Sequence, residues 1–248
     1  MTREEFRTLC RKKIVCLDGA TGSNLIRRGM PAGVCPESWI LEHPQIMTAL
    51  QREYIQAGSD IIYAPTFTSN RIKLKEYGLD DRTEEINRGL VSLSREAAAG
   101  KAWVAGDLTM TGQQLAPVGT LDFEDLVDIY KEQIGYCVQA GVDLLVVETM
   151  MSLQESRAAL IAARETCDLP VMVTMTFETD GRSLFGTDAA TAAIVLEHLG
   201  ADAVGANCST GPDKMAEVIA AMAAVTSMPL IAKPNAGLPC LDENGQTV

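Results

Sequence analysis

Short apolar runs alternate with longer amphipathic stretches along the whole chain. The runs are rich in Val, Ile and Leu and are apolar at successive positions, which is typical of strands buried on both faces. They predict seven strands, at residues 14–17, 61–64, 102–105, 144–147, 171–175, 203–206 and 230–232. Between the runs, apolar residues recur at a helical period. These stretches predict helices at residues 44–57, 82–99, 122–140, 153–167, 188–199 and 212–226.

This alternation predicts an α/β fold in which right-handed crossovers connect the strands of a parallel sheet. A (β/α)8 barrel of the TIM type and an open doubly wound sheet both satisfy the pattern. Polar or unusual residues follow every predicted strand, which favours the barrel, because functional strand ends converge from all around a barrel. Since seven strands are found, we expect residues 1–248 to form a single barrel domain, truncated at the C-terminus, that lacks its last strand–helix unit.

The composition excludes several classes of partner. Acidic residues outnumber basic ones by 33 to 21, so the net charge is −12. Nucleic acids and anionic membranes are bound by clustered positive charge, and we expect neither as a partner. No run approaches the ~18 apolar residues of a spanning helix, and the N-terminal MTREEFRTLCRKK has no secretory apolar core. The seven cysteines show no paired spacing, which favours free thiols over disulfides. Because thiols stay reduced in the cytoplasm, we expect a cytoplasmic protein.

Two strand ends carry carboxylates. Asp18 and Gly19 follow the first predicted strand, where glycine lets the backbone approach a ligand closely. An Asx turn would explain the same residues. Glu148 ends a run of four apolar residues, and a carboxylate there must be paired or reach a site, because burying it alone is costly. Backbone donors inside the barrel would satisfy Glu148 equally well, whereas Asp18 and Glu148 together could hold an α-ammonium group.

Cys208 ends the sixth predicted strand, directly before the start of a helix. The positive end of the helix favours a thiolate, which is a nucleophile or a ligand for a soft metal. Simple packing is the alternative for a lone cysteine. Cys240 follows the seventh predicted strand and could approach the same end, but nothing around it marks a ligand. Neither of the two histidines follows a strand, so we do not expect Cys–His or Ser–His catalysis.

Short motifs recur in a fixed order at the strand ends. Together they resemble the homocysteine S-methyltransferase family over essentially all of the chain, and they are closest to the homocysteine-binding module of cobalamin-dependent methionine synthase. The motifs are Asp18-Gly19-Ala20-Thr21-Gly22, Pro65-Thr66-Phe67, Gly106-Asp107, Val147-Glu148-Thr149, Gly186-Thr187-Asp188, Gly205-Ala206-Asn207-Cys208 and Pro234-Asn235-Ala236-Gly237.

The resemblance implies a (β/α)8 barrel that transfers a methyl group to the zinc-activated thiolate of homocysteine and forms methionine. It implies that Cys208 is one of three cysteine ligands of Zn²⁺ and that the other two, an adjacent pair, are absent from this chain. The implied methyl donor is methylcobalamin or another corrinoid, bound by another domain or protein. With one ligand of three, we expect the isolated chain to be inactive or nearly so.

The resemblance also implies roles in substrate binding. Asp18 and Glu148 would hold the substrate ammonium group, and Asn207 would orient Cys208. Asn235 and the backbone at Ala236 would take the substrate carboxylate. The remaining expected substrate-binding residues are Gly19 and Thr66.

Several alternatives remain open. A homocysteine methyltransferase that uses betaine or S-methylmethionine would share the barrel and the zinc site. A non-catalytic amino-acid-binding barrel would fit a chain that ends at Val248. A carboxylate-based lyase or aldolase is a further class, although Lys233 is the only lysine that follows a predicted strand. The unpaired edges of the first and seventh predicted strands would favour an oligomer or docking against another domain.

Overall fold

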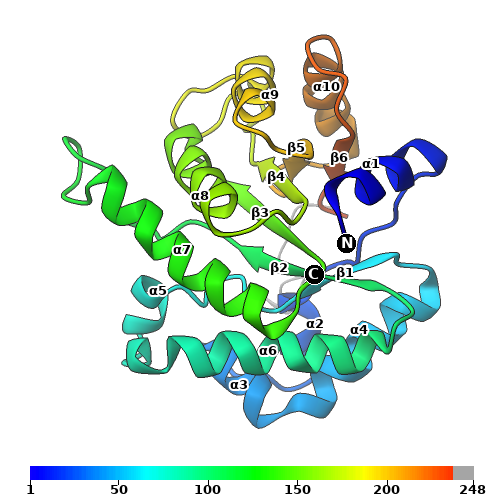
Figure 1. The fold of residues 1–248 in the computed structure, drawn as a ribbon, viewed down its shortest axis with the longest axis vertical. Helices are drawn as coiled ribbons and strands as arrows, with labels where there is room; N and C mark the ends of the chain where they lie inside the picture. The colour runs from blue at the N-terminus through cyan, green and yellow to red at the C-terminus, as the bar shows by residue number, and fades with distance from the viewer. Residues whose placement is uncertain (237–248) are drawn as a thin grey trace, which may run out of the picture.

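Within residues 1–236, the protein is built around one sheet of six parallel strands, in which each strand pairs with the next one in the sequence. The computed structural model describes residues 1–236, and Cys240 lies outside them. Figure 1 shows the strands at the centre of the molecule with the helices around them. The strands are β1 (Ile61–Ala64), β2 (Trp103–Leu108), β3 (Leu144–Met150), β4 (Val171–Met175), β5 (Ala203–Asn207) and β6 (Leu230–Lys233).

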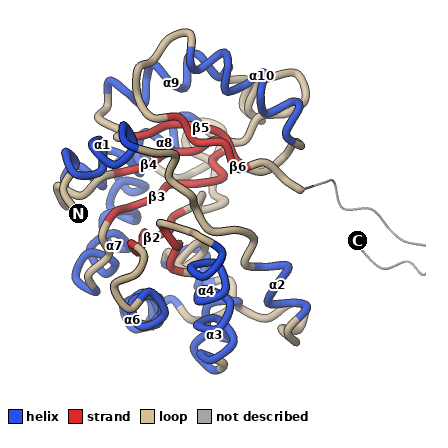
Figure 2. Tube along the Cα trace, turned by 90° about the vertical axis from the view of Figure 1, so that its right-hand side faces the viewer, coloured by secondary structure: helices blue, strands red, loops and turns tan. Residues whose placement is uncertain are grey.

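The six predicted helices are confirmed, with small differences at their ends. They lie outside the sheet (Figure 2) and are α4 (Pro44–Ala57), α6 (Thr83–Ala98), α7 (Phe123–Ala140), α8 (Leu153–Thr166), α9 (Ala189–His198) and α10 (Pro212–Ala223). Shorter elements that the sequence pattern did not predict are α1 (Arg3–Lys12), α2 (Gly22–Arg27), α3 (Pro36–Glu42), α5 (Arg71–Lys75) and a 3-10 turn, η1 (Asp80–Arg82).

The order of the strands decides between the two predicted architectures. The sheet runs from β1 to β6 in sequence order, as in a barrel, whereas a doubly wound sheet reverses its order at a switch point. The open doubly wound alternative is therefore wrong. The sheet curls into an incomplete barrel with β1 and β6 as its edges, and the described residues do not show the closed eight-stranded form.

The predicted strand at residues 14–17 is also wrong. Ile14 is 90% exposed, and the segment meets the sheet through a single bridge between Leu17 and Ile61. A strand needs a partner along its length, but a cleft of about 860 Å³ separates this segment from β6. The apolar run could not reveal this, because the pattern of one segment says nothing about its neighbours. The cleft lies where a further strand would complete a closed barrel.

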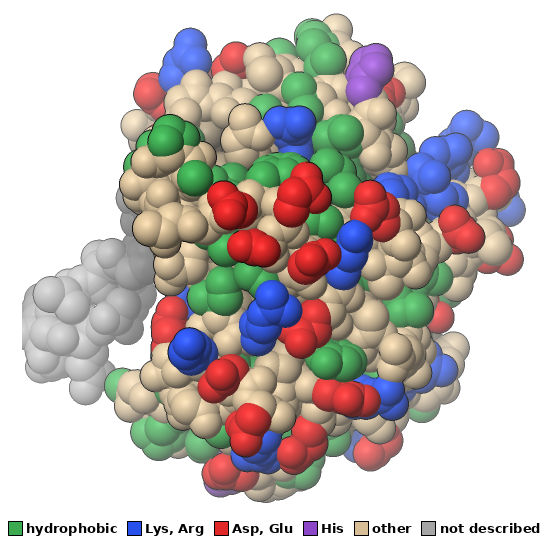
Figure 3. Space-filling view, turned by 60° about the vertical axis from the view of Figure 1, so that its left-hand side comes forward, with side chains coloured by type: hydrophobic (Ala, Val, Ile, Leu, Met, Phe, Trp, Pro, Cys, Tyr) green, Lys and Arg blue, Asp and Glu red, His purple; other side chains and the backbone are tan. Residues whose placement is uncertain are grey.

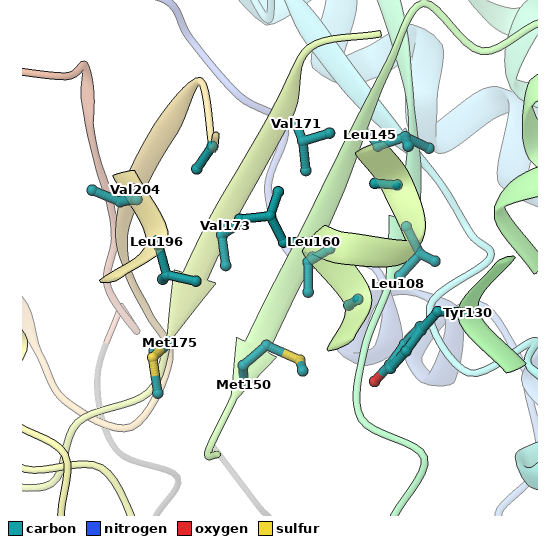
Figure 4. Packing of buried hydrophobic residues seen from close by; sticks show 14 of the residues in the cluster. Leu108, Tyr130, Leu145, Met150, Leu160, Val171, Val173, Met175, Leu196 and Val204 are labelled. Atoms are coloured by element: carbon teal, nitrogen blue, oxygen red, sulfur yellow. The ribbon is translucent and has the colours of Figure 1, made fainter. Parts of the chain in front are cut away.

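Both faces of the sheet are buried, which explains the unbroken apolarity of the predicted strands. Successive side chains point to opposite faces of a strand. On the outer face, Leu160 of α8 and Leu196 of α9 pack against strand residues such as Val173 (Figure 4). Burying one such side chain stabilises the fold by about 1.5–3 kcal/mol. The inner face is filled by Phe6 of α1 and by Ile61, Tyr63, Ala105, Leu144, Val146, Met172, Ala203 and Ile231.

The N-terminal helix α1 is fastened to the amino ends of the strands by Asp202, whose side chain has no exposed surface. Arg3 Nε lies 2.9 Å from one carboxylate oxygen, and Arg7 approaches the same oxygen at 3.3 Å. Arg164 of α8 lies 2.7 Å from the other oxygen, which also accepts the Val171 N–H over 3.0 Å. One carboxylate thus joins α1, α8 and the starts of β4 and β5.

Figure 3 shows acidic and basic side chains on one face of the molecule, with several acidic side chains near its centre and basic ones around them. Among residues 1–236, every helix is too short or too polar to cross a lipid bilayer.

We expect Asp202→Asn to lower the free energy of unfolding by about 3 kcal/mol, because three arginines lose the buried charge that they surround. Urea denaturation measures this loss. The matched control is Asp128→Asn, since Asp128 is 69% exposed and lies 3.8 Å from Lys131. The control should change stability by less than about 1 kcal/mol. Equal effects of the two substitutions would contradict the assigned role of Asp202.

Candidate active site

The alternation of side chains places polar groups inside the carboxyl end of the incomplete barrel. Each strand presents every second residue to the interior. The next interior position therefore lies two residues further along the strand. Glu148 follows the interior residue Val146 in this way, and Lys233 follows Ile231. The last interior positions of β2 to β6 are all polar, namely Asp107, Glu148, Thr174, Asn207 and Lys233.

Lys233 lies between two carboxylates. Its Nζ is 3.7 Å from Asp18 Oδ1 and 3.6 Å from Glu148 Oε2. The same ammonium group lies 3.9 Å from the centre of the Tyr63 ring. The Tyr63 N–H donates to Asp18 Oδ2 over 2.8 Å and so fixes this carboxylate. The structure therefore brings together Asp18 and Glu148, as predicted, and adds Lys233 and Tyr63 to them.

Burial weakens the acids of this cluster. It raises the pKa of Asp18 to about 6, although Lys233 and the Tyr63 N–H act in the opposite direction. Burial also raises the pKa of Glu148, an effect that Lys233 opposes. Burial and the charge of Glu148 raise the pKa of Asp107 well above its usual range. One lysine therefore does not compensate for the three acids, and the cluster is short of positive charge.

Three buried polar atoms of the cluster have no hydrogen-bond partner among the described residues. They are Asp18 Oδ1, Asp107 Oδ1 and the Tyr63 hydroxyl oxygen. An unpaired buried polar group costs about 1–3 kcal/mol, and folded proteins pair nearly all of them. A ligand that brings hydrogen-bond donors and positive charge would satisfy these atoms.

The charge of Lys233 bears on the lyase or aldolase alternative. Burial lowers the pKa of Lys233, but Glu148, Asp18 and Asp107 raise it more, so the pKa lies above its usual range. A lysine must lose its proton before it can attack a carbonyl carbon and form a Schiff base. The three acids keep Lys233 protonated, which argues against this alternative.

Asn207 fixes the environment of the Cys208 thiol. Its Nδ2 donates to Thr149 Oγ1 over 2.8 Å and lies 3.2 Å from Cys208 Sγ. Its Oδ1 accepts the Thr149 N–H over 2.9 Å and the Thr174 hydroxyl over 2.8 Å. These partners set the orientation of the amide, so that one N–H of Nδ2 faces the sulfur.

The backbone around the thiol is strained. Thr149, Cys208 and Ser209 have φ angles of 61°, 60° and 56°, in the left-handed region. This conformation costs a residue other than glycine of the order of 1–3 kcal/mol, and it is especially rare for a β-branched residue such as Thr149. Thr149 Oγ1 lies 4.0 Å from Cys208 Sγ. The strain is thus concentrated at the two turns that meet at the thiol, which supports a functional role for them.

Thr66 and Gly19 have structural roles in the described fold. Thr66 is fully buried, and its hydroxyl donates to the Asp107 carbonyl over 2.8 Å and accepts the Asp107 N–H over 3.0 Å. Both hydrogen bonds join β1 to β2. A Cβ atom at Gly19 would lie 2.8 Å from Cε1 of Tyr54, so glycine allows the tyrosine ring to pack there. Neither observation by itself indicates contact with a ligand.

Asn235 and Ala236 extend from β6 at the carboxyl end of the barrel. Asn235 is half-buried, and its N–H donates to the Thr210 carbonyl over 3.2 Å. Ala236 is exposed. Their expected role in binding a carboxylate stays a prediction.

Cys208 is the only predicted metal ligand that the structure describes. Among residues 1–236, no three His, Cys, Asp or Glu side chains lie close enough together to hold a metal ion. The described residues therefore do not form a zinc site by themselves. Cys240 lies outside the described residues.

Sequence reasoning missed Lys233, Tyr63 and Thr149 as members of the site. A period-two reading of β1 and β6 would have placed Tyr63 and Lys233 inside the barrel with the acids. Thr149 follows Glu148 directly, but nothing in the sequence indicates its left-handed backbone.

We expect Asp18→Asn to change the pH dependence of stability. The carboxyl has a pKa of about 6 in the folded chain and about 3.9 when unfolded, so the folded state binds more protons between these values. The free energy of unfolding therefore falls as the pH rises from about 4 to 6. Asparagine cannot ionise, so the variant should gain about 2–3 kcal/mol relative to the wild type between pH 4 and pH 7.

Urea denaturation at both pH values measures this difference. The matched control, Asp213→Asn, lies on the exposed first turn of α10 and should show no such gain. A difference between Asp18→Asn and the wild type that is the same at pH 4 and pH 7 would contradict the raised pKa.

Comparisons with known proteins identify relatives in sequence and in fold. The chain is 28% identical over 253 residues to "Methionine synthase" of Mycobacterium tuberculosis, and equally to that of Mycobacterium leprae. Each match covers 94% of this chain and 21% of the relative, so the chain spans about a fifth of these proteins.

Among solved structures, the metallated form of the homocysteine methyltransferase MmuM from Escherichia coli superposes with a TM-score of 0.82. That match is 21% identical and covers 94% of this chain and 87% of the other. At this identity it shows the fold alone. The sequence model of the homocysteine S-methyltransferase family matches residues 15–248. The resemblance found in the motifs is therefore confirmed, and this chain belongs to the homocysteine S-methyltransferase family.

Proposed function

We propose that this chain is the homocysteine-binding barrel of an enzyme that transfers a methyl group to the homocysteine thiol and forms methionine. The observation that carries the proposal is the contact between a buried acidic cluster and the turn that bears the Cys208 thiol. The Cys208 N–H donates to the carbonyl of Lys233 over 3.1 Å. Thr149, which follows Glu148 directly, places its hydroxyl oxygen 4.0 Å from Cys208 Sγ. The proposed ammonium site and the thiol therefore lie at the same end of the sheet, as a short amino-acid thiol requires.

The substrate ammonium group would bind Asp18 and Glu148. Asp18 Oδ1 is buried and accepts no hydrogen bond from the described residues, and Glu148 Oε2 meets Lys233 only at 3.6 Å. At ~4 Å and an effective dielectric constant of about 20, one such charge pair gains roughly 4 kcal/mol before desolvation is subtracted. Ionised Asp18 is needed for this contact, so binding would strengthen as the pH rises through about 6.

Cys208 would be one ligand of Zn²⁺, with Asn207 orienting its sulfur. The described residues supply this single ligand, so the remaining ligands would come from outside residues 1–236. When bound, zinc supplies the Lewis acidity that removes a proton from a thiol at neutral pH. Thr149 and Thr174 hold the Asn207 amide, and through it the position of the thiol.

The methyl donor would be methylcobalamin or another corrinoid carried by another domain or protein. The similarity to two methionine synthases, of which the chain spans about a fifth, supports this donor. Betaine and S-methylmethionine are the alternative donors. A non-catalytic amino-acid-binding barrel would keep the ammonium site but would not depend on Cys208 for any reaction.

Methionine formation by the polypeptide of the complete gene tests the proposal, with zinc and homocysteine supplied and each of the three donors tried in turn. We expect activity with methylcobalamin. We expect Cys208→Ser to reduce the rate of methionine formation by more than about a hundredfold. Replacing residues that only hydrogen-bond to metal ligands already lowers activity by roughly 10–100-fold, and loss of a ligand should lower it further.

Cys167→Ser is the matched control, since Cys167 caps the C-terminus of α8. It should leave the rate of methionine formation within about twofold of the wild type, because it lies outside the site. An active Cys208→Ser enzyme, or no methionine with any donor, would overturn the proposed function.

A further inference from the structure

The ammonium group of Lys233 is held within the acidic cluster but is not hydrogen-bonded to it. Its Nζ lies 3.6 Å and 3.7 Å from the nearest oxygens of Glu148 and Asp18. Charge-assisted hydrogen bonds are normally about 2.7–2.9 Å long. The Tyr63 ring, 3.9 Å from Nζ, holds the cation by a cation–π contact. Lys233 therefore has N–H donors that pair with no acceptor among residues 1–236, and its side chain is 24% exposed.

The acids of the cluster also keep free acceptors. Asp18 Oδ1 and Asp107 Oδ1 are buried and accept no hydrogen bond from the described residues. A lysine that served only to neutralise its neighbours would use its donors on these oxygens. The site instead presents unused donors and unused acceptors side by side.

A ligand that satisfies both must carry a cation and an anion a few ångströms apart. An α-amino acid does so, because its ammonium and carboxylate groups are attached to the same carbon. The ammonium would donate to Asp18 and Glu148, and the carboxylate would accept from Lys233. The side chain of Asn235, two residues further along the same turn, would add a neutral donor.

We propose that Lys233 binds the α-carboxylate of the substrate and so makes the site selective for amino-acid thiols over simple amino thiols. This inference rests on the proposed function, in which Asp18 and Glu148 bind the substrate ammonium group. The opposite role is that Lys233 occupies the ammonium site and competes with the substrate. The two roles predict effects of opposite sign when the lysine charge is removed.

The test compares two ligands and two proteins. The ligands are homocysteine and 3-aminopropane-1-thiol, which has the same amine and thiol but no carboxylate. The proteins are the 248-residue chain and its Lys233→Met variant, which keeps an unbranched side chain without charge. Dissociation constants come from NMR titration, and thermal unfolding shows whether the variant is folded.

We expect Lys233→Met to weaken homocysteine binding by about tenfold to a hundredfold, the usual range for a hydrogen bond to a charged group. Binding of 3-aminopropane-1-thiol should change by less than about twofold, because this ligand does not use the lysine. The wild-type chain should itself prefer homocysteine by about tenfold or more, which keeps the test valid even if the variant does not fold. Lys233→Arg should recover part of the loss.

Equal weakening of both ligands, or tighter binding of both by Lys233→Met, would overturn the inference and leave the proposed function standing. Equal affinity of the wild-type chain for homocysteine and 3-aminopropane-1-thiol would also overturn the inference and leave the proposed function standing. A wild-type chain that binds neither ligand would overturn the proposed function, and this inference with it.

Discussion

The carboxyl end of the incomplete barrel depends on the electrostatic contacts of Lys233 with Asp18 and Glu148. They join the last strand of the sheet, the third strand and the segment before the first strand, which are far apart in the sequence. Burying three acids beside one cation is unfavourable, as the raised pKa values of Asp18, Glu148 and Asp107 show. A fold that served stability alone would place apolar residues at these interior positions. The arrangement is therefore best explained by a positively charged group of a ligand.

The two ends of the strands have different tasks. At the amino ends, three arginines surround Asp202 and fasten α1 across the sheet, and the polar groups there are paired. At the carboxyl ends, several buried polar atoms have no partner in the described part of the chain, and the backbone at Thr149 and Cys208 is strained. Parallel barrels generally carry their active sites at the carboxyl ends. Within residues 1–236, the paired charges around Asp202 and the candidate site thus lie at opposite ends of the strands.

Much of the fold could be predicted from the sequence, because strands buried on both faces are unbroken apolar runs. The ends of β1 and β4 agree with the predicted ranges. The strand predicted at residues 14–17 does not form, because a strand also needs partners along its length. Asp18 and Glu148 were expected at the same end of the barrel because each follows a predicted strand, and both lie beside Lys233 there. Lys233 was not predicted to be a member of the acidic cluster, because the spatial neighbours of a lysine cannot be read from its own segment. The left-handed backbone of Thr149 could not be predicted either, since it depends on hydrogen bonds to Asn207, which is distant in the sequence.

The proposed binding of an amino-acid ammonium group by the buried acidic cluster can be tested at a single carboxyl carbon. Carbon-13 NMR of the Asp18 side chain follows its ionisation with and without homocysteine. If Asp18 binds the ammonium group, its pKa should be about 6 in the free chain. This pKa should fall clearly when homocysteine binds, because the positive charge favours the ionised carboxylate. A pKa near 4 in the free chain, or one that saturating homocysteine leaves unchanged, would contradict it.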